Sequence, residues 1–348
     1  MTLTAAFRFF KKYVLVSAWL LSLLLLTNFS SQPPPAWDAD TPVFEVLQYL
    51  GETPPGHYLE NITPEMIKRG EDIIRKGRTI GSDGALSGYV SKYYDCTSCH
   101  NITIEDPDLR ASDPEARLAY VQEKNIPFLQ GTTFYGAVNK ESWYNDDYVK
   151  KYGEMVYEAN KDIKAAIQLC ATECAQGRRV TDWEIEAMLA YLWSLGYQLG
   201  DLDMLAADYQ KLNAQAADPS NHEELREWVK SFYLLKSPAT FVEVPEDKQA
   251  GYPLEGNAER GKAIYNTSCQ FCHRPYGVSN FWLDDSELTF RKLRKNMAKA
   301  NHFSIYEMIR HGTYAVPGHK PYMPLYTKER MSDQQVEDLR AFIENRAM

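Results

Sequence analysis

Two five-residue stretches of the chain combine a pair of thiols with an imidazole at fixed spacing. They are Cys96-Thr97-Ser98-Cys99-His100 and Cys269-Gln270-Phe271-Cys272-His273. Cys-x-x-Cys-His is the attachment signature of c-type haem, in which the thiols bond to the porphyrin and the histidine reaches the iron. One copy alone could be a redox or zinc motif that happens to precede a histidine. Two copies predict two covalently attached haem c groups, with His100 and His273 as proximal iron ligands.

The second ligand of each iron decides its potential and reactivity. Met323 lies between Tyr322 and Pro324, 50 residues after His273 and shortly before the end of the chain. A thioether in such a proline-flanked loop raises the potential and suits an electron carrier, so we predict Met323 as the second ligand of that iron. The alternatives are three histidines of the same region: His302, His311 and His319.

The first motif has no matching Met-Pro loop, but two further cysteines follow it. Cys170 and Cys174 are four residues apart, so a helix would present both on one face. A thiolate on the iron would lower its potential and leave a nucleophilic sulfur beside a redox centre. We predict one of these two cysteines as this ligand, with Met155 as an alternative. The cysteines could also form a strained disulfide or remain two buried thiols.

Helices must position these residues, and their signatures occur twice. Short amphipathic stretches at 62–77 and 257–269 each carry Arg-Gly ahead of a motif, and capping boxes at Thr181 and Ser332 each open an apolar helix. This pattern predicts an all-α fold with two class I cytochrome c-like domains in tandem. The predicted ranges are a signal-anchor segment (1–30), a proline-rich linker (31–45), a first domain (46–199), a helical linker (200–250) and a second domain (251–348).

Residues 13–29 are almost wholly apolar and follow Arg8, Lys11 and Lys12. A basic flank stays in the cytoplasm, which predicts that the segment holds the protein at the inner membrane, facing the periplasm or cell exterior. The alternative is a signal peptide, whose removal would leave a soluble periplasmic protein. The net charge of −9 argues against nucleic acid and for a redox protein or respiratory complex as partner.

Residues from about Tyr49 to Leu199 resemble the haem domains of thiosulfate dehydrogenases and of the related sulfur-oxidising haem subunit. That family places a glycine seven residues after a haem-ligating cysteine, and then a helix of the type Ala-x-x-Ala-Tyr-Ile. Cys170, Gly177 and the stretch 188–192 (MLAYL) match this pattern, whereas Cys174 has no equivalent. The second half resembles the His/Met electron-transfer domain that follows in the dihaem enzyme. The resemblance implies that Cys170 ligates the first iron and is catalytic.

Two functions follow from these observations. The first is a dihaem electron carrier outside the inner membrane. The second is an enzyme that couples two thiosulfates to tetrathionate at the haem of Cys170 and passes electrons to the haem of Met323. A small sulfur oxyanion as substrate would need nearby cations, and Arg178, Arg179 and Lys140 are available.

Overall fold

The computed structural model describes residues 36–299, 304–313 and 323–348. Regular structure in these ranges is helical, with isolated bridges and no named strand, which confirms the all-α prediction for them. The predicted anchor at 13–29 lies outside the described residues, as do His302 and His319. Within the described part, no helix has both the length and the apolar character needed to cross a membrane.

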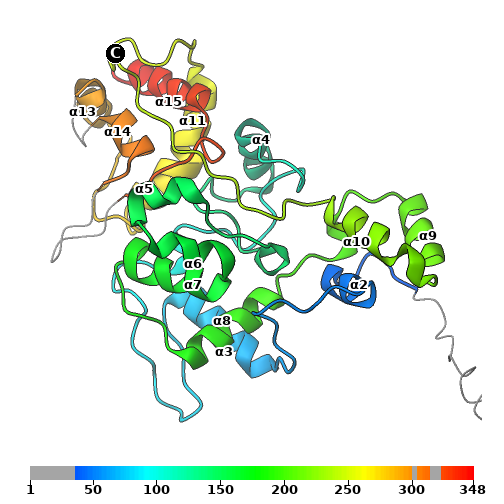
Figure 1. Cartoon of the computed structure of the whole chain (residues 1–348). Helices are drawn as coiled ribbons and strands as arrows, with labels where there is room; N and C mark the ends of the chain where they lie inside the picture. The colour runs from blue at the N-terminus through cyan, green and yellow to red at the C-terminus, as the bar shows by residue number, and fades with distance from the viewer. Residues whose placement is uncertain (1–35, 300–303, 314–322) are drawn as a thin grey trace, which may run out of the picture.

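Figure 1 shows the α-helices, with colours that follow the order of the chain. Their bounds are α2 (Val43–Tyr49), α3 (Pro64–Lys76), α4 (Pro114–Lys124), α5 (Val149–Tyr152), α6 (Met155–Lys161), α7 (Ile163–Leu169), α8 (Asp182–Trp193), α9 (Ala206–Gln215), α10 (His222–Lys230), α11 (Ala258–Ile264), α12 (Gln270–His273), α13 (Glu287–Met297), α14 (Ile305–Arg310) and α15 (Asp333–Arg346). Two π-helical turns, Cys170–Cys174 and Tyr265–Cys269, continue α7 and α11.

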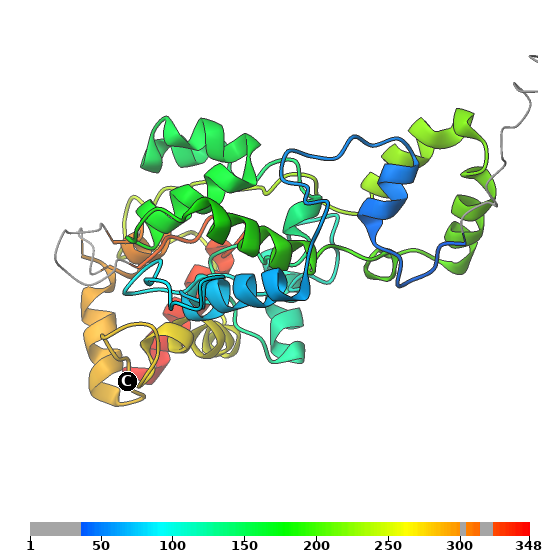
Figure 2. The ribbon, with the colours of Figure 1, turned by 90° about the horizontal axis from the view of Figure 1, so that it is seen from below.

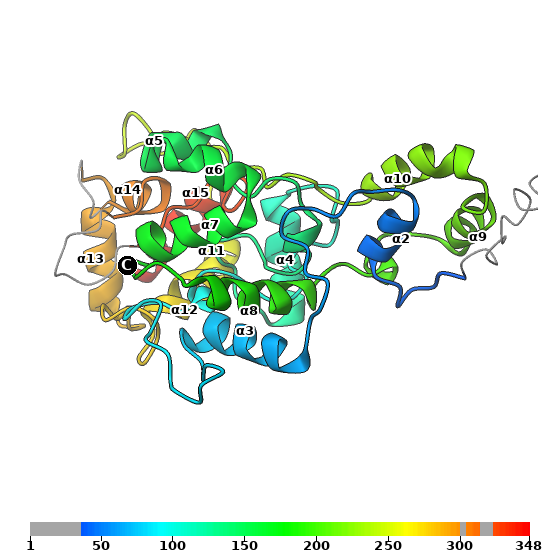
Figure 3. The same cartoon turned by 60° about the horizontal axis from the view of Figure 1, so that its bottom comes forward.

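Helices α3 and α8 pack against each other and frame the first motif (Figure 3). The Thr63 side chain caps the start of α3, and α8 begins with the predicted capping box of Thr181 and Glu184. Gly70 lies where the helices meet, and a methyl group there would overlap the carbonyl oxygen of Ala187. Glycine is therefore needed for this close approach.

Helices α11 and α15 repeat the arrangement around the second motif. The Asn257 side chain caps α11, and the predicted capping box of Ser332 and Gln335 opens α15. A methyl group on Gly261 would overlap the carbonyl oxygen of Asp338, as it would for Gly70 against Ala187 in the first pair. The repeated Arg-Gly pattern thus marks the same helix crossing in both halves.

Helix α4 belongs by sequence to the first half but packs with the second. Leu118, Val121 and Phe128 are buried in one cluster with residues of α11, α13 and α15. The amide of Phe128 also donates to the carbonyl of Thr267, at 3.0 Å. The two halves therefore share a core instead of meeting only at their surfaces.

A third group of helices lies to one side of both helix pairs (Figures 2 and 3). Helices α2, α9 and α10 bury apolar side chains together, including Val46, Leu212 and Val229. The region from 200 to 250 contains α9 and α10, which pack against α2. His222, in this group, contacts the carbonyl of Ala216 at 2.9 Å.

Candidate haem sites

The first motif begins in a tight turn that its own sequence explains. Asp95 precedes the 3₁₀ turn Cys96–Ser98, and its carboxylate accepts from the amide of Ser98 at 2.8 Å. Such capping satisfies a backbone donor that the turn leaves open. The amide of His100 then bonds to the carbonyl of Cys96 at 3.1 Å, so the two thiols and the imidazole come from one compact turn.

The ring of His100 is held in one orientation. Its Nδ1 donates to the carbonyl oxygen of Thr132 at 2.6 Å, and the ring stacks on Phe134 with centroids 4.4 Å apart. A methyl group on Gly131 would come within 2.6 Å of the ring, so the chain passes directly beside it. Because a carbonyl only accepts, Nδ1 carries the proton and Nε2 keeps its lone pair for a metal. This geometry fits a proximal haem ligand.

His273 repeats this arrangement in the second motif. Its Nδ1 donates to the carbonyl oxygen of Phe281 at 2.7 Å, which again leaves Nε2 available. The segment that follows is fastened to the motif, since the amide of Leu283 bonds to the carbonyl of His273 and the amide of Ser279 to that of Cys272, both at 2.8 Å. Both motifs thus fit the same group in the same way.

The two motifs lie close together in space. Burial raises the pKa of the Cys99 thiol above its ordinary value, and the neighbouring thiol of Cys272 raises it further. Tyr94 is half-buried near both, since burial and the charges of the same two thiols raise its pKa. Attachment points far apart in the sequence therefore meet around Tyr94.

The backbone of Met323 is held by two hydrogen bonds to Thr313. Its amide donates to the hydroxyl of Thr313 at 2.7 Å, and the amide of Thr313 donates back to the Met323 carbonyl at 2.9 Å. Gly312, at a φ of +67°, makes room for that carbonyl. The predicted alternative His311 instead contacts the Glu307 carboxylate at 2.8 Å.

Cys170 and Cys174 lie on the π-helical turn, and both lie near the thiols of the first motif. The six cysteines, all within the described ranges, form no disulfide. A hydrogen bond to Cys174 raises the pKa of the Cys170 thiol most, followed by burial and by the charges of Cys174, Cys96 and Cys99. Cys174 in turn contacts the hydroxyl of Tyr152 at 3.3 Å. The alternative ligand Met155 is 51% exposed.

Gly177, seven residues after Cys170, has a packing role. A methyl group on it would overlap the carbonyl oxygen of Val90, just ahead of the first motif. The amide of Arg178 bonds to that same carbonyl at 2.8 Å. The glycine thus lets the cysteine-bearing segment lie against the chain that leads into the motif.

Two of the three cations that a sulfur oxyanion would need are engaged by other side chains. Arg178 pairs with Glu184 at 2.6 Å, and Arg179 is exposed. Lys140 is buried, donates to the Ser237 hydroxyl and lies near the Glu105 carboxylate. A cation that the sequence did not single out, Lys151, lies near Cys174 and donates to the carbonyl of His311 at 3.1 Å.

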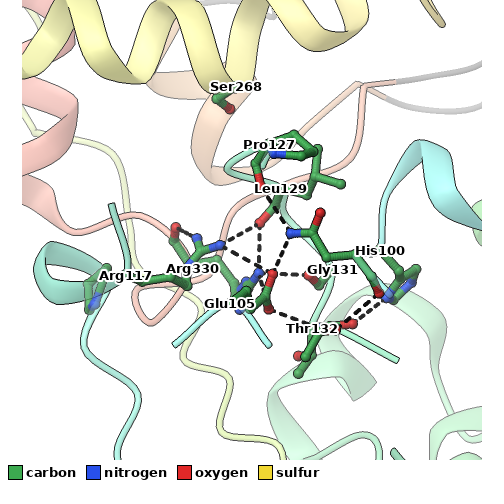
Figure 4. Close-up of polar contacts among 12 residues, drawn as sticks. His100, Glu105, Arg117, Pro127, Leu129, Gly131, Thr132, Ser268 and Arg330 are labelled. Atoms are coloured by element: carbon green, nitrogen blue, oxygen red, sulfur yellow. Dashed lines mark hydrogen bonds and ion pairs between the residues drawn. The ribbon is translucent and has the colours of Figure 1, made fainter. Parts of the chain in front are cut away.

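A buried charge cluster beside the first motif also escaped sequence reasoning. Glu105 is fully buried and pairs with Arg330 at 2.8 Å and with Arg117 at 3.8 Å (Figure 4). Arg330 follows Met323 in the sequence. It also bonds to Leu129, which lies 201 positions earlier, so the cluster joins distant parts of the chain. No local pattern in the sequence signals such a contact.

Comparison with known proteins supports the haem assignment in the second half of the chain. Residues 256–343 match the family model of cytochrome c oxidase, cbb3-type, subunit III. No curated protein and no solved structure matches the chain. The matched range contains the second motif, Met323 and Arg330. The C-terminal part of the chain is therefore a c-type cytochrome domain, which implies covalently bound haem c and haem-based electron transfer with a redox partner.

Proposed function

We propose that this protein is a dihaem c-type cytochrome that carries electrons outside the inner membrane, between a redox protein or respiratory complex and an acceptor. One observation carries the proposal. The helix crossing at glycine and the histidine Nδ1 bonded to a carbonyl occur in the first half as they do in the matched C-terminal domain. Bound haem supplies a reversible one-electron couple at each site.

The proximity of the motifs supports electron exchange between the two sites. Cys272 lies close enough to Cys99 to raise the pKa of the Cys99 thiol, and both thiols raise the pKa of the neighbouring Tyr94. Cys96 and Cys99 would attach the first haem and Cys269 and Cys272 the second. His100 and His273 would be the proximal ligands.

The test counts haems in the holoprotein by mass and by the absorbance of the extracted haem. Wild type should carry two. The variants Cys96→Ala/Cys99→Ala and Cys269→Ala/Cys272→Ala serve as matched controls for each other, and each should lose one. A protein that carries a single haem, unaffected by the first double variant, would refute the dihaem proposal.

A second candidate function is that of an enzyme resembling thiosulfate dehydrogenase. The proximity of Cys170 and Cys174 to the thiols of the first motif favours it, because a cysteine ligand is what that resemblance implies. Arg178 is paired with Glu184 and Lys140 is bonded to Ser237, so two of the cations that the substrate would need already have other partners. The carrier function is therefore the primary proposal.

Paired measurements separate the two functions. If the enzyme function holds, electron paramagnetic resonance of the oxidised protein should show a low-spin thiolate signal that Cys170→Ala removes and Cys174→Ala keeps. Thiosulfate-dependent reduction of ferricyanide, lost in the same variant, would support the enzyme. Two His/Met-type signals without turnover would leave the carrier alone.

A further inference from the structure

Arg330 belongs to the C-terminal cytochrome domain but makes its contacts in the first half. It lies between Met323 and α15, and its side chain is only 6% exposed. The Nη2 group donates to the carbonyl oxygens of Leu129 at 2.9 Å and Gly131 at 2.7 Å, and it pairs with Glu105 at 2.8 Å (Figure 4). A single guanidinium thus holds two carbonyls of the loop 129–131 and the carboxylate of Glu105, which precedes α4.

The carboxylate at the centre of this cluster has a full set of partners. Besides Arg330, Glu105 accepts from the Asn101 side chain at 2.7 Å and from the amide of Thr133 at 2.9 Å. Arg117 supports the same point, since it donates to the carbonyls of Arg330 at 2.5 Å and Leu129 at 3.2 Å. A buried carboxylate this well satisfied stays charged and rigid, and removal of one partner is costly.

The loop held by Arg330 is the loop that orients His100. Gly131, whose carbonyl Arg330 binds, passes against the imidazole ring, and its amide bonds to the Cys99 carbonyl at 3.0 Å. The next residue, Thr132, accepts the Nδ1 proton of His100 at 2.6 Å. Groups that hydrogen-bond a metal-ligating histidine set its orientation and basicity, and hence the potential of the metal.

We propose that Arg330 is a positioning residue for the proximal histidine of the first haem site. It acts through Glu105 and the carbonyls of Leu129 and Gly131, so that the C-terminal domain controls the ligand geometry of the other site. This inference rests on the proposed function, because it requires a haem on His100. It goes beyond it in assigning that haem's environment to a residue of the other domain.

The test uses the full-length holoprotein with Arg330→Gln. Electron paramagnetic resonance spectra and optical redox titrations should show a changed signal for the first haem. We expect about a tenfold change in its reduction equilibrium relative to the second haem. Arg330→Lys, which keeps the charge without the planar fork, should restore the first-haem signal in part.

Arg310→Gln is the matched control. Arg310 is also a buried arginine of the C-terminal domain, but it pairs with Asp333 and binds the Met331 carbonyl within that domain. Its replacement should leave the first-haem signal unchanged. The inference is overturned if Arg330→Gln changes neither haem or only the second.

A folding defect would not block the test. If Arg330→Gln does not fold, Arg330→Lys is measured instead, because it keeps a positive charge beside Glu105 but lacks the planar fork that binds the two carbonyls. The haem count separates the two proposals. One attached haem sinks the proposed function, whereas two attached haems with an unmoved first-haem signal sink only the role of Arg330.

Discussion

Asp106 lies next to the buried cluster with one carboxylate oxygen buried and, among the described residues, without a hydrogen-bond partner. It lines a cavity of about 40 Å³ together with Lys140, Arg330 and Thr132, which is room for water. Burial raises the pKa of Asp106 to about 6, and the charge of Glu105 raises it as well. Burial lowers the pKa of Lys140 to about 8. Both charged forms are therefore disfavoured here.

Asp106→Asn should stabilise the protein at neutral pH and not in acid. The folded-state pKa is above the unfolded value, so the folded protein holds a proton that the unfolded chain has lost between about pH 4 and 6. Its free energy of unfolding therefore falls as pH rises through that range. Above pH 6 the variant should be more stable by up to about 3 kcal/mol, with little difference at pH 4, as measured by denaturant unfolding.

Asp108→Asn provides the comparison on the same loop. Hydrogen bonds from Arg110 lower the pKa of this exposed carboxyl, so its charged form is favoured. This variant should not gain stability above pH 6. Equal stabilisation of both variants would contradict the assignment to burial of Asp106.

At the scale of elements, the crossing of α3 with α8 and of α11 with α15 depends on one glycine each. Gly70→Ala and Gly261→Ala would each force a helix away from a carbonyl of its partner. We expect a loss of about 2 kcal/mol or more in each, because close-packed helices do not absorb an extra methyl group. Thermal unfolding of the holoprotein measures the loss.

Gly56→Ala is the control for these variants, since a methyl group there meets nothing within 4 Å. Its melting temperature should match wild type. A Gly70→Ala protein as stable as Gly56→Ala would show that the α3–α8 crossing is looser than described.

The elements were also the most predictable part of the molecule. Capping boxes at Thr181 and Ser332 and the apolar spacing behind them are local signals, and both helices begin where these signals stand. The partners of His100 and His273 could not be predicted, because they are backbone carbonyls that carry no residue-type signature. The contact of Arg330 with Glu105 was equally invisible, since it depends on how two halves dock.

At the scale of the whole molecule, the shared core predicts one cooperative unfolding transition. Phe128, contributed by the first half, is fully buried among residues of the second, and the Arg117 guanidinium lies 3.8 Å over its ring. Phe128→Ala should cost about 3–5 kcal/mol and shift the whole transition in calorimetry. Gln122→Ala, at an exposed position on α4, should leave it in place. Two separate transitions, with only one displaced, would contradict the shared core.

The long span closed by Arg330 has a consequence for biogenesis. Leu129 leaves the ribosome 201 positions before Arg330, which at 5–20 residues per second is a delay of about 10–40 s. During that interval the nascent chain holds Glu105 with Arg117 but without Arg330. A chain that stops before Arg330 therefore lacks the residue that holds the loop beside His100, although that loop is translated first.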